Sequence, residues 1–303
     1  MDGLWIPVTI AAAGFQALRT SLQKYLTGRV STIASTFTRF AFGLPFALLW
    51  LLALTLGRGV PMPAPDRDFF LIVAVGAVGQ ILATALLLHV VTLRNVAVGV
   101  AFSKAEIILT AIFGFVVLGD ALTVWAVLAI VIGTLGVMVT SMKTSDRPLA
   151  ALLGGIGERT ALLGLVSGSL FGVSAVAFRA ASTGLGHPDV LVSAAYALAW
   201  ATAIQTGVMA AWLWARERDQ FARLRAAWRP SLAAGIAGVA GSACWFTAMT
   251  IQTVAIVRTL GLVELLFTFA MSVLWFRERP TKAEVAGVVL LVAAIVLLLN
   301  PPR

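Results

Sequence analysis

The chain has 303 residues, of which 60% are hydrophobic and only 12% are charged. Soluble domains carry charge on roughly a quarter of their residues, so this composition excludes a soluble globular protein. The net charge of +9 is therefore assigned to cationic loops beside anionic lipid and not to nucleic-acid binding. Apolar stretches of about 18 residues or more can cross a bilayer as helices, which predicts an all-α, polytopic membrane protein.

In chain order, the apolar segments predict ten membrane-spanning helices. Turn residues such as Gly119-Asp120 and Arg279-Pro280 separate several neighbouring spans. Two connections, residues 142–159 and 215–229, are longer and polar, and the first divides the chain into two halves. The predicted spans are residues 4–24, 31–56, 69–92, 95–118, 121–141, 160–182, 188–214, 230–250, 253–276 and 281–299.

The two halves resemble each other when the sequence is shifted by 158 residues without gaps. Five spans per half would insert the second copy in the opposite orientation, which predicts two inverted five-helix repeats. We assign residues 1–142 to the first repeat, 143–159 to a linker and 160–303 to the second repeat. The polar or otherwise matching positions are Thr92 and Thr250, Glu106 and Glu264, Thr110 and Thr268, Asp120 and Glu278, Thr123 and Thr281, and Val127 and Val285.

The loops differ in their content of Lys and Arg. The loops after the odd-numbered spans hold 14 of these residues, whereas the other loops and both termini hold three. Positively charged loops remain in the cytoplasm, so this count predicts that both termini lie outside.

The fourth span of each half carries a recognisable pattern. Residues 103–120, with Glu106 and a Gly-Asp turn, and residues 261–278 resemble the EamA family of the drug/metabolite transporter superfamily. Arg39-Phe resembles the opening of that family's second helix. The resemblance implies ten helices, an inner-membrane location and transport of small metabolites. Ile107 and Leu265 stand where the family motif has proline, so we expect the local kink there to be missing.

Glu106 and Glu264 lie near the middle of their predicted spans. An ionised group at that depth costs roughly 2.5–3.5 kcal/mol, so each should face protein or water. One hypothesis is that the carboxylates bind a cationic group or carry a proton; the other is that they have a structural or gating role. Lys104 has no counterpart in the second half and is a candidate for substrate selectivity.

These charges are poorly placed to pair along their own helices. Lys104 is two residues from Glu106, about 200° around the helix, and Arg258 is six residues from Glu264, about 240° around. We therefore expect partners from other helices, such as Arg39 or Arg19. The complete set of candidate substrate or coupling residues is Glu106, Glu264, Lys104, Arg39, Arg19, Arg258, Gln16, Gln80, His89, Phe102 and Trp245.

Two alternatives remain open for several neutral candidates. His89 is either an interfacial histidine without a specific role or a pH-sensing or substrate-contacting group. Glycines at every third or fourth residue mark two spans, at Gly164, Gly168 and Gly172 and at Gly235, Gly238 and Gly241. These stripes allow either close helix packing or relative sliding. Pro7 and Pro45 are candidates for helix kinks.

No motif for metal, phosphate or nucleophilic catalysis is present in the sequence, so we predict no enzyme activity, catalytic residue, metal or cofactor. The prediction is a secondary transporter that exports a small polar or amphipathic metabolite, such as an amino acid, by alternating access. Its expected partners are this substrate, membrane lipid and a proton as coupling ion. The alternatives are a lipid flippase and a membrane scaffold that transports nothing.

Overall fold

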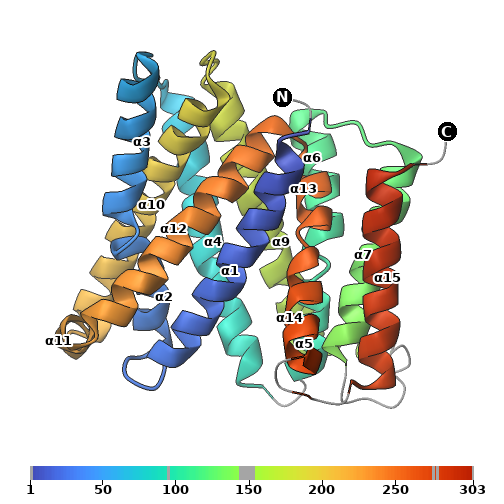
Figure 1. The fold of residues 1–303 in the computed structure, drawn as a ribbon. Coiled ribbons are helices and arrows are strands. Elements are labelled where there is room, and N and C mark those ends of the chain that lie inside the picture. The colour runs from blue at the N-terminus through green and yellow to red at the C-terminus, as the bar shows by residue number, and fades with distance from the viewer. Residues whose placement is uncertain (1–2, 94–95, 143–153, 275–276, 278–279, 302–303) are drawn as a thin grey trace. The chain divides into compact units, whose positions relative to one another are not determined.

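The computed structural model describes residues 3–93, 96–142, 154–274, 277 and 280–301 (Figure 1). Within this part of the chain, every regular element is an α-helix. The helices are α1 (Trp5–Leu26), α2 (Thr32–Ala41), α3 (Leu44–Arg58), α4 (Arg67–Val91), α5 (Val96–Ser103), α6 (Glu106–Leu118), α7 (Val124–Ser141), α9 (Arg159–Gly184), α10 (Val190–Arg216), α11 (Asp219–Ala226), α12 (Trp228–Ile251), α13 (Val254–Leu260), α14 (Val263–Leu274) and α15 (Lys282–Leu299).

Each predicted span coincides with one helix or with two consecutive helices. Among the described residues, eight spans are long and apolar enough to cross a membrane. The chain is therefore a multi-pass helical membrane protein, whereas the count of ten spans stays a prediction. Linker residues 143–153 and the turn residue Glu278 lie outside the described residues.

Pro45 divides the second span, as predicted. It occupies the first turn of α3, where its missing N–H leaves no intrahelical bond unmade. The N–H groups of Phe46 and Ala47 both donate to the carbonyl of Gly43, so the helix restarts there. Pro7 also lies in the first turn of its helix, α1, but there it stands at the start of the span and the helix continues unbroken to Leu26.

The same cap begins the last helix of each half. Thr123 accepts a hydrogen bond from the Ala126 N–H at the start of α7. Its counterpart Thr281 accepts one from the Glu284 N–H at the start of α15, where the Glu284 carboxylate completes a capping box. As a result, α7 and α15 begin and end at equivalent positions under the 158-residue shift.

The chain forms two compact units, and each takes segments from both halves of the sequence. Unit 1 contains residues 1–78 and 177–251, and unit 2 contains residues 79–176 and 252–303. The helices α4 and α9 contribute to both units. The boundaries of the compact units therefore differ from the predicted division at residues 143–159, which stays a prediction about the sequence repeat.

In unit 2, α7 packs along its counterpart α15 (Figure 1). Gly133 faces Ala294, Gly136 faces the backbone of Leu291, and Gly287 faces Thr140. Residue numbers rise along one helix as they fall along the other, so these equivalent helices are antiparallel. A core of buried side chains lies beside them and comprises Ile107, Ile130, Val137, Ala255, Leu262 and Leu291.

In unit 1, α12 packs along α1 and against α2, and α10 packs against α2 and α3 (Figure 1). The contact between α3 and α10 is apolar, and its buried residues are Leu51, Leu54, Val192, Ala195 and Ala199. Apart from α2, each of these helices has one face against its neighbours and another with exposed apolar side chains, such as Leu49 at 59% and Leu56 at 79% exposure. Lipid tails are the environment that suits such exposed faces.

Candidate functional site

The fourth and ninth spans are each interrupted at equivalent positions. In the fourth span, α5 ends at Ser103 and α6 begins at Glu106, and the intervening N–H of Lys104 donates to the carbonyl of Ala101, three residues back. In the ninth span, the Leu262 N–H donates to the Thr259 carbonyl in the same way. The expectation that replacing the motif proline removes the irregularity was wrong.

The reason lies in backbone packing around the first interruption. Gly168 of α9 approaches so closely that a Cβ there would lie 2.6 Å from the Ser103 carbonyl oxygen and 3.2 Å from the Glu106 nitrogen. Gly164 meets the Gly99 backbone, and Gly172 meets Thr110. The stripe on α9 therefore provides close helix packing.

Both mid-span glutamates lie in the first turn of the helix that follows an interruption. Glu106 is the first residue of α6, and Glu264 is the second residue of α14. The first turn of a helix has unpaired N–H groups and a partial positive charge, which stabilise a nearby carboxylate. An interrupted span therefore offers a favourable environment for a glutamate that an unbroken one lacks.

Glu106 pairs with an arginine from the other repeat. The Nη1 of Arg258, on α13, lies 3.4 Å from the Glu106 Oε1, and the two side chains are 19% and 15% exposed. The partner does come from another helix, as predicted. It is Arg258, however, and not the suggested Arg39 or Arg19, because α13 packs directly against α6.

The remaining candidates of unit 2 lie in the interruption of the fourth span and on two helices, α4 and α5. Lys104 lies in the interruption itself, two residues from Glu106 in sequence. Phe102 packs at the edge of a core that contains Val98 and Met142. His89 is exposed in the last turn of α4, whereas Gln80 is half-buried on the same helix.

Four candidates come together in unit 1, around the glycine stripe of α12. The Trp245 Nε1–H donates to the Gln16 Oε1 at 3.1 Å. Arg39 and Arg19 flank Gly238, where a Cβ would lie 3.0 Å from the Arg39 Cγ and 3.5 Å from the Arg19 Cδ. The stripe on α12 thus leaves room for two arginine side chains, and the guanidinium of Arg39 also lies 5.0 Å from the Phe40 ring centroid.

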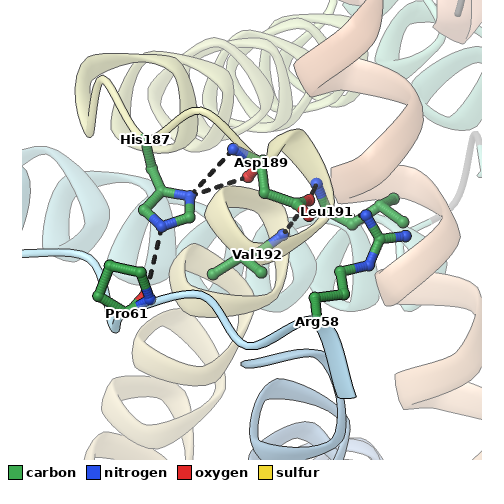
Figure 2. A network of polar contacts seen from close by, with 6 residues as sticks. All are labelled: Arg58, Pro61, His187, Asp189, Leu191 and Val192. Carbon is green, nitrogen blue, oxygen red and sulfur yellow. Dashed lines mark hydrogen bonds and ion pairs between the residues drawn. The ribbon is translucent and has the colours of Figure 1, made fainter. Parts of the chain in front are cut away.

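A polar network that the sequence analysis missed joins two loops of unit 1 (Figure 2). The Arg58 Nη1, at the end of α3, lies 2.6 Å from the Asp189 Oδ2. Asp189 also caps α10 by accepting from the N–H groups of Leu191 and Val192. His187 accepts from the Asp189 N–H through Nδ1 at 3.1 Å, which leaves Nε2–H to donate to the Pro61 carbonyl.

The ionisation of Asp189 reflects this network. Burial by itself would raise the pKa of Asp189, but the Arg58 guanidinium and the two backbone N–H groups outweigh it. The pKa of Asp189 is therefore held below its ordinary value of 3.8. The carboxylate stays charged and links the ends of α3 and α10 at neutral pH.

A related link is found at the other end of α10. Ser31 caps α2 by accepting from the Ala34 N–H, and its hydroxyl donates to the Glu217 carboxylate just after α10. The Ser31 N–H donates to the Gln220 side chain at 2.8 Å. Under the repeat shift, Ser31 corresponds to Asp189. The only signal of these links in the sequence is that both residues are good helix caps preceding a span.

The comparisons with known proteins agree with this architecture. A solved structure titled "Crystal structure of protein" superposes with a TM-score of 0.68 over 98% of this chain and 99% of its own, at 17% identity. At that identity, the likeness concerns the fold alone. No curated protein matches the chain.

The family comparison also detects the duplication. The EamA-like transporter family matches residues 3–142 and matches again over residues 159–300. Together the two matches cover nearly the whole chain and coincide with the two halves identified by the 158-residue shift. The protein therefore belongs to the EamA-like transporter family, which is represented by two repeats in this one chain.

Proposed function

We propose that this protein is a secondary transporter of the inner membrane that exports a small polar or amphipathic metabolite by alternating access. An amino acid or related compound is the best candidate substrate. Such a molecule carries both an ammonium and a carboxylate, and the chain has both glutamates and arginines within its spans. Membership of a transporter family supports the general class, and the in-span charges support a polar substrate.

The observation that carries the proposal is the Glu106–Arg258 pair at an interrupted helix. Its two residues come from different repeats, so a relative movement of α6 and α13 would change the pair. Interrupted helices near mid-membrane also leave backbone groups able to bind substrate or a coupling ion. We propose that release of Arg258 lets Glu106 accept a cationic group or a proton.

Glu264 and Lys104 complete the proposed site in unit 2. Glu264 occupies the equivalent helix start in the second repeat and would serve as a second acidic group. Lys104 lies in the interruption and would favour substrates that carry an anionic group. In unit 1, we propose that Arg19, Arg39 and the Gln16–Trp245 pair contact the substrate or gate its movement.

The test is transport of radiolabelled amino acids in proteoliposomes, with an imposed proton gradient and without one. We expect Glu106→Gln and Glu264→Gln to lower the transport rate by at least tenfold, and Lys104→Ala to change substrate preference. Asp68→Asn removes an exposed carboxylate in the first turn of α4 and serves as the control. Unchanged transport in all three variants would remove these residues from the mechanism.

The same vesicles test the two alternatives. A lipid flippase would move a fluorescent phospholipid between leaflets and leave soluble solutes untouched. A scaffold would move neither. Either result, obtained with folded protein, would contradict the proposed transport of a metabolite.

A further inference from the structure

The connection between α10 and α12 carries an unusual concentration of arginine. Five arginines lie within 14 residues there, and all five are exposed. We name this set the arginine cluster. It comprises Arg216, Arg218, Arg223, Arg225 and Arg229.

The short helix α11 holds the cluster in place. Gln220 and Leu224 of α11 are buried, and the helix contacts α2 and α12. The Phe221 ring lies edge-on to the Phe37 ring of α2, with centroids 6.1 Å apart, and 6.2 Å from the Trp214 ring. Because α11 is anchored by this face, its arginines are presented outward from unit 1.

Two exposed tryptophans indicate how deep the arginine cluster lies relative to the membrane surface. Trp214, near the end of α10, is 61% exposed, and Trp228, at the start of α12, is 51% exposed. Exposed tryptophans at the ends of spans lie at the level of the lipid headgroups. The Arg218 guanidinium lies 4.9 Å from the Trp214 ring centroid, and that of Arg229 lies 5.4 Å from the Trp228 ring centroid.

These contacts hold two guanidinium groups at headgroup depth. Arg218 is fixed further, because its Nε–H donates to the Trp214 carbonyl at 2.7 Å. A guanidinium at that level can form paired hydrogen bonds with a phosphate, and stacking on an aromatic ring orients it for this.

The acidic residues nearby leave the cluster with an excess of positive charge. Glu217 accepts a hydrogen bond from the Ser31 hydroxyl, and Asp219 pairs with Arg223, its Oδ2 lying 3.0 Å from the Arg223 Nε. Five arginines against these two carboxylates give residues 212–229 a formal charge of +3. Anionic lipid at a membrane surface attracts such a segment.

We propose that the arginine cluster is a binding site for the headgroup phosphates of anionic phospholipids in the surrounding bilayer. The Arg218–Trp214 and Arg229–Trp228 pairs form its two ends, and α11 lies between them. The proposal concerns a surface of unit 1 and does not depend on what the protein transports.

The test uses the full chain purified in detergent and measures its unfolding midpoint with phosphatidylglycerol, phosphatidylcholine or inorganic phosphate. We expect phosphatidylglycerol alone to raise the midpoint of the wild type. The double variant Arg218→Gln/Arg229→Gln should lose at least half of that rise. The charge-matched control Lys24→Gln/Lys282→Gln removes two exposed cations that no aromatic ring of the described residues holds, and it should keep most of the rise.

A second measurement keeps the outcome independent of folding. Native mass spectrometry should show fewer bound phosphatidylglycerol molecules on Arg218→Gln/Arg229→Gln than on the wild type, with Arg218→Lys/Arg229→Lys in between. Equal lipid binding by the wild type and the glutamine variant would overturn the proposal. A rise in midpoint of equal size with phosphatidylcholine or with inorganic phosphate would overturn it as well.

Discussion

Both compact units use a helix with regularly spaced glycines, but the neighbours of these glycines differ. In unit 2, the stripe on α9 meets backbone atoms, since Gly164 faces Gly99 and Gly168 faces the interrupted segment. In unit 1, Gly238 of the stripe on α12 meets the side chains of Arg39 and Arg19. Glycine therefore serves two purposes. At Gly164, Gly168 and also at Gly235, which meets the backbone of Phe42 and Gly43, it allows close approach of another backbone, whereas at Gly238 it leaves space for long cationic side chains.

The largest loss of unfolding free energy is expected where Gly168 of α9 contacts backbone atoms in unit 2. In Gly168→Ala, the new Cβ would lie 2.6 Å from the Ser103 oxygen, and a backbone carbonyl cannot move away easily. We expect the free energy of unfolding to fall by about 1–3 kcal/mol, as in overpacked cores. Chemical unfolding in detergent measures this change.

Gly14→Ala is the matched control for Gly168→Ala. Gly14 also lies in a helix interior, but nothing lies within 4 Å of a Cβ built there. Alanine favours a helix over glycine, so this variant should gain up to about 1 kcal/mol. Equal losses in both variants would show that close packing at Gly168 is not the cause.

Breaking the ion pair of unit 2 should give the next largest loss of unfolding free energy. Arg258→Gln leaves the Glu106 carboxylate without its guanidinium partner, and we expect a loss of about 1–3 kcal/mol in unfolding free energy. The double variant Arg258→Gln/Glu106→Gln should recover part of that loss, because the Glu106 charge is then removed together with its guanidinium partner. Losses that simply add would mean that the two residues do not interact.

The cap of α10 in unit 1 is expected to contribute less. Asp189→Ala removes an N-cap worth about 1 kcal/mol and an exposed ion pair worth about 0.2–1 kcal/mol. Asp189→Asn keeps a capping oxygen and should lose only the contribution of the ion pair. If both variants unfold at the same midpoint, the cap is not what stabilises this end.

Because the pKa of Asp189 is low, the difference in stability between the wild type and these variants should depend on pH. Because its pKa is lower in the folded state than the ordinary 3.8, Asp189 stabilises the fold fully at higher pH. That contribution is lost as the pH falls below 3.8 and through the folded pKa. The difference between the wild type and Asp189→Asn should therefore shrink in acid, whereas a constant difference would contradict the assignment.

The smallest effect is expected at the side-chain contact of unit 1. In Gly238→Ala, the nearest atom to the new Cβ is the Arg39 Cγ at 3.0 Å, and this flexible side chain can shift. The helix preference for alanine offsets the crowding, so we expect a change within about 1 kcal/mol. A loss as large as that of Gly168→Ala would remove the contrast between Gly168 and Gly238.

Much of the fold could be predicted from the sequence because each span is a local, strongly apolar pattern. The repeat could also be recognised, because polar residues such as Glu106 and Glu264 match under the 158-residue shift. Similar hydrophobic composition alone would not produce such a match. The interruptions at Lys104 and Leu262 could not be predicted, because no proline marks them. The close packing of Gly168 at the first of them involves a helix distant in sequence.

The site was predictable only in part, for the same reason. The in-span charges could be identified one by one from the insertion cost of each. Their partners could not, because Arg258 meets Glu106 through the packing of α13 on α6, and Arg58 meets Asp189 only when α3 lies beside α10. The candidates gather in two groups, one in each unit.

The contacts between the equivalent helices α7 and α15 bear on how the two copies evolved after they were joined in one chain. Gly133 faces Ala294, which is the counterpart of Gly136, and Gly136 faces Leu291, which is the counterpart of Gly133. Such reciprocal contacts are those of an interface between two identical subunits, where any substitution is imposed on both sides at once. In a fused chain each side mutates alone, and here both positions are glycine in the first copy, Gly133 and Gly136, and larger residues in the second, Leu291 and Ala294. Joining the copies has freed this interface to become asymmetric.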